Sequence, residues 1–175
     1  MSAFTATDVE AVIPRLRRYA RALTGSREAA DDLTQDTLER AWGKRALWRP
    51  DTNLRAWLFT VMHNVHVNGL KSARRTEAGG VDAEEERLPA ASSSIETGIV
   101  LSELRAALAA LPDDQRAVVL LVGLEQLSYA EAADVLGIPA GTVMSRLARG
   151  RERLRTLLEI GPGNAGRAAL LRRVK

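Results

Sequence analysis

Apolar residues recur at helical spacing in several parts of the chain, most clearly in residues 142–158. The apolar positions there lie four or seven residues apart: Val143, Leu147, Leu154 and Leu158. This spacing places them on one face of an α-helix, with Gly150 between them. Residues 142–158 are therefore predicted to form an amphipathic helix whose apolar stripe packs inward.

A second helix is predicted immediately before this one. Ser128 and Glu131 have the spacing of a capping box, in which each side chain bonds a backbone amide at the helix start. Gly137 is predicted to end the helix. Pro139 and Gly141 suit a short turn because one fixes φ and the other relaxes backbone sterics. Residues 128–158 are thus predicted to form a helix-turn-helix.

Polar and basic residues occupy the face opposite the apolar stripe. Thr142, Ser145 and Arg149 project from the side opposite the stripe, and Arg146 and Arg153 flank them. The helix carries five arginines against one glutamate. A guanidinium can bind a guanine edge or a phosphate, and small hydroxyl side chains allow close approach, so the pattern favours DNA in the major groove. A solvated, arginine-rich helix is the alternative.

The amino-terminal residues predict a first helix with clear ends. Thr7 with Glu10 offers a capping box, Pro14 lies near a helix start or a kink, and Gly25 ends the helix. Its apolar face is formed by Leu16, Ala20 and Leu23.

Ser26 is predicted to cap the next helix, which has an acidic outward stripe. The residues expected to face inward are Ala30, Leu33, Thr37, Ala41 and Trp42. The outward residues are Asp32, Gln35, Asp36 and Glu39. Surface acids are common, so the spacing alone favours a stripe that is merely solvated.

A third helix is predicted after the turn-prone residues 50–53, with Thr52 or Asn53 as its cap. Its expected apolar face is Leu54, Trp57, Leu58, Val61 and Val65. Its polar line is Thr60, Asn64, Asn68, Lys71, Arg74 and Arg75. Amides can donate to and accept from base edges, and cations can hold phosphates. This face therefore either binds nucleic acid or is solvated.

The composition changes sharply between these helices and the helix-turn-helix. Residues 77–98 hold six acidic groups against one arginine, together with helix-breaking glycines and a proline. Such a segment has little to bury and predicts a linker. We therefore expect an all-α fold of two small helical domains, residues 1–76 and 98–160, joined by a flexible acidic linker, residues 77–97. A basic tail, residues 161–175, follows.

Several classes of protein are disfavoured by the rest of the sequence. The 175 residues include no cysteine, which excludes disulfides and thiolate metal sites, and no apolar run long enough to cross a membrane. A signal segment is not recognisable, so a cytoplasmic protein without membrane insertion is expected. His63 and His66 lack a carboxylate at ligand spacing. No enzyme activity, metal, cofactor or small-molecule substrate is expected.

Four stretches in order along the chain resemble the sigma factors of the extracytoplasmic-function (ECF) class. They are ADDLTQDTLERAW in residues 30–42, NLRAWLFTVMHN in residues 53–64, LPDDQR in residues 111–116 and GTVMSRLAR in residues 141–149. The resemblance implies that the first domain is sigma region 2 and the second is sigma region 4. It also implies that the chain binds core RNA polymerase and directs initiation at promoters with minus 10 and minus 35 elements.

The resemblance implies roles for particular residues. The acidic stripe of Asp32, Gln35, Asp36 and Glu39 would dock on the polymerase clamp. Asn64 and the loop of residues 48–53 would form a pocket for a base flipped out of the minus 10 element. Ser145, Ala148 and Arg149 would face the minus 35 element, and Arg146 and Arg151 would contact the DNA backbone.

Residues 51–58 and 114–123 further resemble the general-stress-response branch of alphaproteobacteria. This branch implies a stress response and a small anti-sigma factor as partner. Two other classes remain as alternatives. One is a helix-turn-helix repressor, which would need a dimer to span two half-sites. The other is a decoy that binds an anti-sigma factor without contacting promoters.

Overall fold

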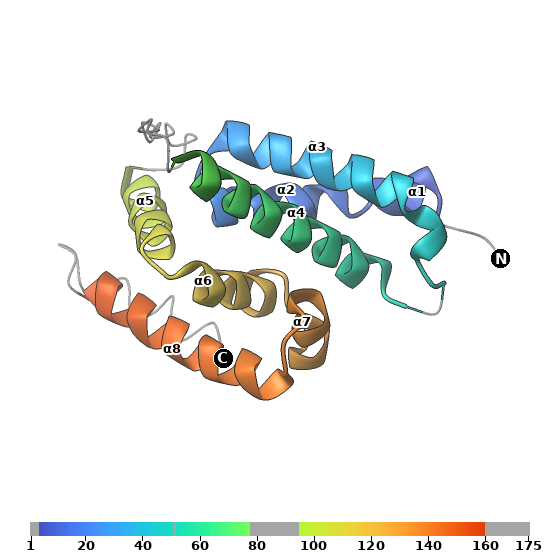
Figure 1. The fold of residues 1–175 in the computed structure, drawn as a ribbon. Helices are drawn as coiled ribbons and strands as arrows, with labels where there is room; N and C mark the ends of the chain where they lie inside the picture. The colour runs from blue at the N-terminus through green and yellow to red at the C-terminus, as the bar shows by residue number, and fades with distance from the viewer. Residues whose placement is uncertain (1–3, 51, 78–94, 160–175) are drawn as a thin grey trace. The chain divides into compact units, whose positions relative to one another are not determined.

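The computed structural model describes residues 4–50, 52–77 and 95–159. Every regular element in these ranges is a helix, and the helices fall into two compact units, so the predicted all-α fold class is confirmed (Figure 1). None of these helices combines the length and the apolar character that a membrane span needs. The predicted linker and tail lie almost entirely outside the described residues.

The first unit begins with two helices, α1 (Ala6–Glu10) and α2 (Ile13–Thr24). The predicted cap at Thr7 is wrong, because Thr7 lies inside α1 and Thr5 caps it. The Thr5 hydroxyl and amide donate to the Asp8 carboxylate over 2.7 and 2.8 Å, and they lower the pKa of that carboxyl. The cap therefore stabilises α1 above the ordinary carboxyl pKa and is lost as pH falls through the lowered one.

The ends of α2 agree with the sequence analysis. Pro14 lies in the first turn, and Gly25 follows the helix with a φ of 74°, a conformation that favours glycine. The predicted inward residues Leu16, Ala20 and Leu23 are buried. Tyr19 is also fully buried, and its ring packs edge-on against Phe59 with centroids 5.2 Å apart.

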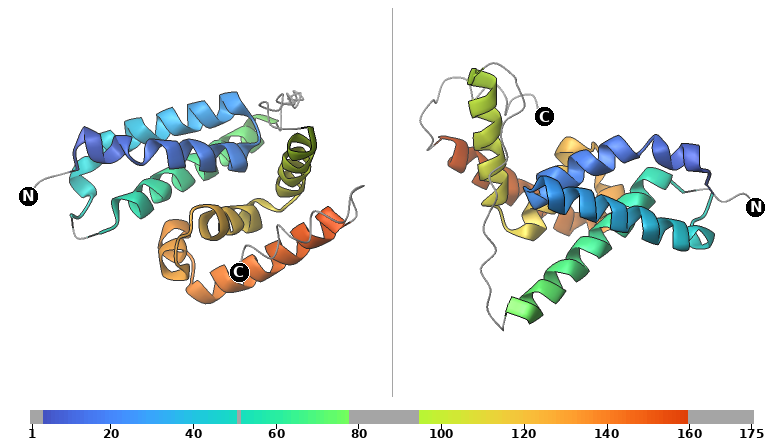
Figure 2. Two further views of the ribbon diagram at one scale, coloured as in Figure 1. Left: turned by 180° about the vertical axis from the view of Figure 1, so that it is seen from behind. Right: turned by 90° about the horizontal axis from the view of Figure 1, so that it is seen from above.

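The helix α3 (Arg27–Gly43) packs beside α2, and the helix α4 (Leu54–Glu77) packs beside α3 (Figure 1 and Figure 2). Ser26 caps α3 by accepting from the amide of Ala29, as predicted. The expected inward residues are buried with the exception of Trp42, which is 43% exposed. Trp42, in the last turn of α3, is therefore not buried as predicted, although its ring packs against that of Phe4.

Asn53 caps α4 by accepting from the amides of Arg55 and Ala56. The buried face of this helix differs from the predicted face. Phe59 and Met62 are fully buried, whereas Leu54, Trp57 and Val61 are half-buried. The centre of the interface is thus rotated toward Phe59 and Met62, and only Leu58 and Val65 of the predicted face are buried.

An aromatic cluster surrounds Phe4, a residue that the sequence analysis did not single out. Phe4 is buried, and its ring lies 5.8 Å from that of Trp42, 5.7 Å from that of Trp48 and 5.6 Å from that of Trp57. Trp48 follows a short 3₁₀ helix, η1 (Arg45–Leu47). Contacts of this kind join the segment before α1 to the loop between α3 and α4.

The second unit begins with α5 (Ile95–Ala109) and α6 (Asp113–Val119). The motif LPDDQR covers the turn between them and the first residues of α6. Its last residue, Arg116, donates to the carbonyls of Leu108, Ala109 and Leu111 over 2.7 to 2.9 Å. This arginine satisfies backbone acceptors at the end of α5, which have no partner within the helix, and one in the turn after it. The motif therefore has a clear structural role.

A π-helical turn, η2 (Leu120–Leu124), continues α6. The valine- and leucine-rich residues 118–122 are thus helical. Leu120 and Leu121 are buried, and Glu125 after them is fully buried. Such turns insert one extra residue into the helical repeat.

The predicted helix-turn-helix is confirmed as α7 (Tyr129–Leu136) and α8 (Ala140–Glu159). The Ser128 amide and hydroxyl both donate to the Glu131 carboxylate over 2.9 Å, and the Ser128 hydroxyl accepts from the Glu131 amide. Gly137 ends α7 with a φ of 64°. The second helix begins at Ala140, two residues before Thr142, because the Pro139 carbonyl already accepts from the amides of Thr142 and Val143.

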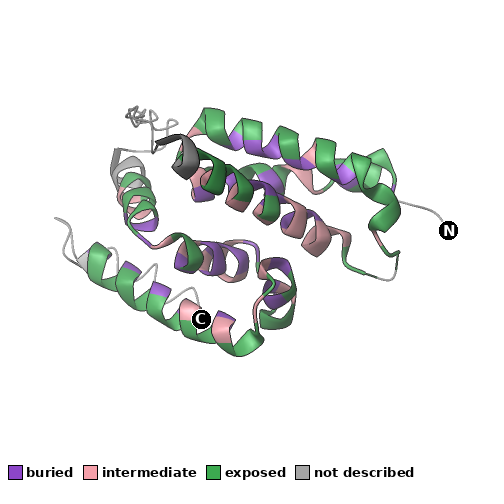
Figure 3. Cartoon of the chain, viewed as in Figure 1, coloured by how far each residue is buried: buried purple, intermediate pink, exposed green. Residues whose placement is uncertain are grey.

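The apolar stripe of α8 packs against the rest of its unit as predicted. Val143, Leu147, Leu154 and Leu158 are all buried (Figure 3). Gly150 lies where α8 meets α6, and a Cβ atom at this position would come within 2.7 Å of Cγ2 of Val119. The two helices can approach this closely only because the residue at position 150 has no side chain.

Candidate nucleic-acid interface

The outward face of α8 is polar and basic, in agreement with the sequence analysis. The exposed residues of the predicted DNA face are Ser145, Ala148, Arg149, Arg151 and Arg153 (Figure 3). Thr142, in the first turn of the helix, is half-buried rather than projecting freely. Ala148 is exposed and presents only a methyl group beside Ser145 and Arg149.

Two hydrogen bonds order this face locally. The Ser145 hydroxyl donates to the Thr142 carbonyl over 3.1 Å, and the Arg149 Nε donates to the Ser145 carbonyl over 3.2 Å. A guanidinium has five N–H donors, so the bond through Nε does not use its two terminal nitrogens. Arg149 therefore has the chemistry for a bidentate contact with a base edge or a phosphate.

Arg146 differs from the predicted picture of a flanking outward arginine. Its side chain is only 28% exposed, and its Nε lies 3.2 Å from Oδ2 of Asp114. Asp114 belongs to the first turn of α6, so this ion pair joins two helices of the unit. The sequence analysis missed Asp114 because the contact joins residues that are 32 positions apart in the chain.

The basic and amide face of α4 is also accessible. Asn64, Asn68 and Lys71 are exposed, whereas Thr60 is half-buried and donates to the carbonyl of Ala56 over 3.1 Å. The polar line is therefore confirmed as an exposed face from Asn64 onward. The side chains of Arg74 and Arg75 lie outside those that the structure describes.

The loop before α4 carries an unusual polar group. Trp48 is half-buried, and its indole Nε1 is buried without a hydrogen-bond partner among the described residues. Thr52 closes a turn, because its amide and hydroxyl donate to the carbonyl of Arg49 over 2.9 and 2.7 Å. Asp51, within the same loop, lies outside the described residues.

The acidic stripe of α3 is exposed along its whole length, as predicted. Asp32, Gln35, Asp36 and Glu39 each belong to the exposed class, and a weak hydrogen bond of 3.4 Å joins Gln35 Nε2 to Glu39 Oε1. The stripe thus presents a run of negative charge on one helix face.

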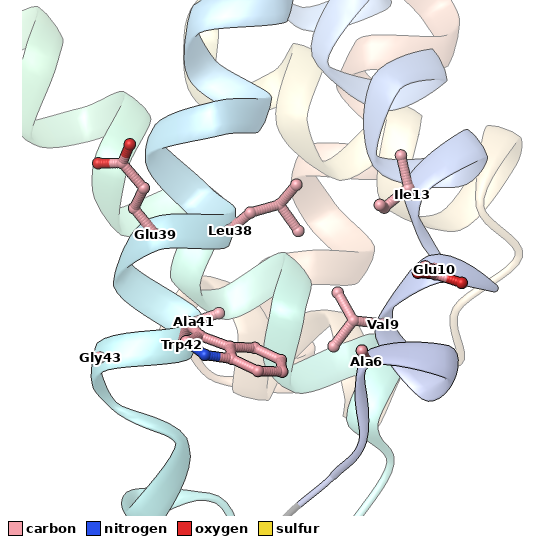
Figure 4. Close-up of a pocket in the computed structure, with 9 residues that line it drawn as sticks. All are labelled: Ala6, Val9, Glu10, Ile13, Leu38, Glu39, Ala41, Trp42 and Gly43. Atoms are coloured by element: carbon pink, nitrogen blue, oxygen red, sulfur yellow. The ribbon is translucent and has the colours of Figure 1, made fainter.

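An apolar cavity of about 500 Å³ lies at the carboxyl-terminal end of this stripe. The residues that line it are Ala6, Val9, Glu10, Ile13, Leu38, Glu39, Ala41, Trp42 and Gly43. Val9, Leu38 and Trp42 point toward one another across the cavity, whereas the Glu39 carboxylate points away (Figure 4). The cavity is therefore suited to apolar side chains, with acidic groups outside it.

Comparison with known proteins places both units in the same class. A family model described as the sigma2 domain of PhyR matches residues 9–63, and one described as sigma-70 region 4 matches residues 101–154. The first match covers residues of α1 to α4, and the second covers residues of α5 to α8.

Full-length relatives extend this similarity over nearly the whole chain. The ECF RNA polymerase sigma factor EcfG of Rhodopseudomonas palustris is 36% identical over 169 residues, which cover 93% of each protein. The sigma factor RpoE of Bartonella quintana, solved in complex with the anti-sigma factor NepR, is 34% identical with a TM-score of 0.78, over 89% of this chain and 97% of that one.

A second solved structure, the PhyRSL–NepR complex of Sphingomonas sp. Fr1, has a TM-score of 0.63 at 20% identity, over 95% of this chain and 96% of that one. This likeness concerns the fold alone. The identity to EcfG, over almost the full length of both proteins, decides the family. The chain belongs to the ECF family of RNA polymerase sigma factors.

Proposed function

We propose that the chain is a promoter-specificity subunit that binds core RNA polymerase, contacts two promoter elements and captures the melted strand. The observation that carries the proposal is that both units expose charged and polar surfaces suited to these partners. The first unit has an acidic stripe and a separate amide and basic face, and the second has the exposed arginine and serine face of α8. We assign the first unit to sigma region 2 and the second to sigma region 4.

In region 4, we assign contact with the minus 35 element to the outward face of α8. Ser145 and Ala148 are small and exposed, which allows the helix to enter the major groove. Arg149 is the residue best suited to a base edge. Arg151 and Arg153 would neutralise phosphates, which contributes affinity with little sequence preference. Arg146 is treated separately below because of its ion pair.

In region 2, we assign the melted minus 10 strand to the α4 face and the loop of residues 48–53. Extruding a base costs a few kcal/mol, which a preformed pocket and positive charge must offset. Asn64 can donate to and accept from a base edge, and Asn68 and Lys71 continue the face toward Arg74 and Arg75. The buried indole Nε1 of Trp48 supports a polar pocket in this loop.

Polymerase binding is assigned to the acidic stripe of Asp32, Gln35, Asp36 and Glu39. A partner surface rich in lysine and arginine would complement these residues. The apolar cavity beside Glu39 would add contact area for an aliphatic side chain of the same partner. Such a combination of charge and apolar contact is typical of specific protein interfaces.

We further propose that a small anti-sigma factor holds the chain inactive until a stress signal releases it. The solved complex of the relative RpoE with the anti-sigma factor NepR supports this regulation. Because the proposed partners are core polymerase and promoter DNA, we place the protein in the cytoplasm. In this role it requires no cofactor and catalyses no reaction by itself.

The decoy alternative is less well supported than the sigma factor. The chain is 36% identical to the sigma factor EcfG and 34% identical to the sigma factor RpoE, over 93% and 89% of its length. The exposed Arg149 and Asn64 also have no evident purpose in a protein that never contacts DNA. A repressor would need a dimer interface, which none of these observations indicates.

Transcription with purified components tests the proposal. Core polymerase, the chain and a library of promoter fragments are combined, and RNA starts are mapped. If the chain is a sigma factor, core polymerase starts RNA at specific sites only when the chain is added. A repressor would bind duplex DNA tightly without polymerase, and a decoy would neither bind duplex DNA nor support starts. Absence of specific starts on any promoter of the library contradicts the proposed function.

The variant Arg149→Ala is expected to weaken promoter binding by roughly 1 to 3 kcal/mol, because a bidentate base contact is lost. The loss should be concentrated at one or two base pairs of the minus 35 element. Gel-shift titration of the holoenzyme on single-substitution promoters measures it. The matched control is Arg155→Ala on the same helix, because Arg155 is engaged in an ion pair with Glu152. Equal effects of both variants would contradict the base contact.

A further inference from the structure

We propose that Asp114 is a positioning residue for promoter recognition, which acts by holding the Arg146 guanidinium in a fixed orientation on α8. The inference rests on the proposed function of the second unit. It concerns a carboxylate on α6, outside the helix-turn-helix.

The geometry supports this role because the ion pair places the guanidinium Nε beside the carboxylate. The Arg146 Nε lies 3.2 Å from Oδ2 of Asp114. An arginine held through Nε keeps its two terminal nitrogens at the opposite end of the planar group, where they form a pair of donors. This is the end that binds guanine or phosphate in a bidentate manner.

The ion pair also removes freedom from a long side chain. Arginine ordinarily loses considerable rotamer entropy when it makes a directed contact. Asp114 is anchored in the first turn of α6, and α6 packs directly on α8. The guanidinium is therefore ordered before DNA arrives, so less entropy is lost on binding.

A role limited to stability does not explain the pair well. The side chains of Arg146 and Asp114 are 28% and 47% exposed, and ion pairs that water can reach contribute little to folding. The neighbouring Asp113 offers a contrast. It lies 3.6 Å from Arg116, the residue that binds the carbonyls at the end of α5, and Arg116 does not belong to α8. Two adjacent carboxylates thus engage arginines with different tasks.

The test compares Asp114→Asn with Asp113→Asn in the full chain bound to core polymerase. Both variants remove one negative charge from the first turn of α6, but only the first loosens Arg146. A promoter is first selected with the unaltered chain, and each base pair of its upstream element is then substituted. Asp114→Asn is expected to reduce affinity for the selected promoter roughly 3- to 10-fold, because part of the binding free energy of one bidentate contact is lost. Asp113→Asn should leave affinity within about 2-fold.

The background variant Arg146→Ala distinguishes positioning from a general structural effect. If Asp114 acts through Arg146, Asp114→Asn has no further effect on promoter affinity in that background. A loss confined to one base pair identifies a base edge as the ligand, and a uniform loss with a smaller salt slope identifies a phosphate. Both results support the proposal.

Two results would overturn it. One is an equal loss from Asp114→Asn with and without Arg146, and the other is a promoter affinity unchanged by Asp114→Asn. Asp114→Glu, which keeps the carboxylate, should recover most of the affinity. If the unaltered chain selects no promoter at all, the proposed function itself fails, which is a distinct outcome.

Discussion

Replacement of both Asp32 and Asp36 by lysine is expected to lower the affinity for core RNA polymerase roughly 30- to 100-fold. The change corresponds to about 2 to 3 kcal/mol, because two attractive contacts with a basic partner become repulsive. Both carboxylates are exposed on α3 and their side chains do not contribute to the packed core. The variant should therefore fold normally. Titration of a fluorescently labelled chain with core polymerase, without DNA, measures the affinity.

Graded variants separate charge from shape at the same positions. The pair Asp32→Asn and Asp36→Asn keeps side-chain size and should lose about half of that free energy. The loss should also shrink as salt is raised, because exposed charges are screened. Asp134→Lys, on α7, makes the same charge change outside the stripe and should be compared with Asp32→Lys alone. Unchanged affinity in the double lysine variant would remove the assignment of the stripe to polymerase.

The parts of the fold that could be predicted are those specified by local chemistry. The cap formed by Ser128 and Glu131 lies within one helical turn, and Gly25 and Gly137 adopt left-handed conformations that few other residues tolerate. Signals of this kind are written in neighbouring residues. The order and approximate extent of the helices therefore followed from the sequence.

The errors arose where the decisive contact comes from elsewhere in the chain. Thr5 and Thr7 are equally suited by local chemistry to cap the helix, because each is followed three residues later by an acidic residue, Asp8 or Glu10. The structure uses Thr5, and the preceding residue, Phe4, packs against three tryptophans. The face of α4 turned toward Phe59 because Tyr19 of α2 packs against it. Helical periodicity defines a stripe only to within about one residue, so the partner helices set its exact centre.

The same distinction between local signals and contacts from elsewhere in the chain applies to the candidate site. Periodicity along α8 correctly predicted that Ser145 and Arg149 would be exposed, since an outward face needs no partner. It could not reveal that Arg146 leans onto Asp114, because this requires the crossing of α8 with α6. Nor did any local pattern predict the full burial of Glu125 after the π-helical turn. Interactions between helices thus determine the finer properties of the interface.

The contact between α6 and α8 at Gly150 gives the second large expected effect, a loss of stability. Gly150→Ala should lower the free energy of unfolding of the second unit by about 1 to 2 kcal/mol, and Gly150→Leu by more than about 3 kcal/mol. The new Cβ would lie 2.7 Å from Cγ2 of Val119, and a β-branched side chain in a helix has little rotational freedom to move aside. The strain outweighs the gain in helix propensity that alanine ordinarily brings, which is about 1 kcal/mol. Urea unfolding followed by far-UV circular dichroism measures the change.

Gly141→Ala is the matched control, because it lies in the same helix and a Cβ there meets no atom within 4 Å. This variant should be neutral or slightly stabilising. The double variant Gly150→Ala with Val119→Ala should recover much of the loss, since the opposing methyl group is removed and the two effects are coupled through one contact. The position of α8 and the Asp114–Arg146 pair both depend on the close approach of α6 and α8. If Gly150→Ala were as stable as Gly141→Ala, this approach would not depend on the absence of a side chain at position 150.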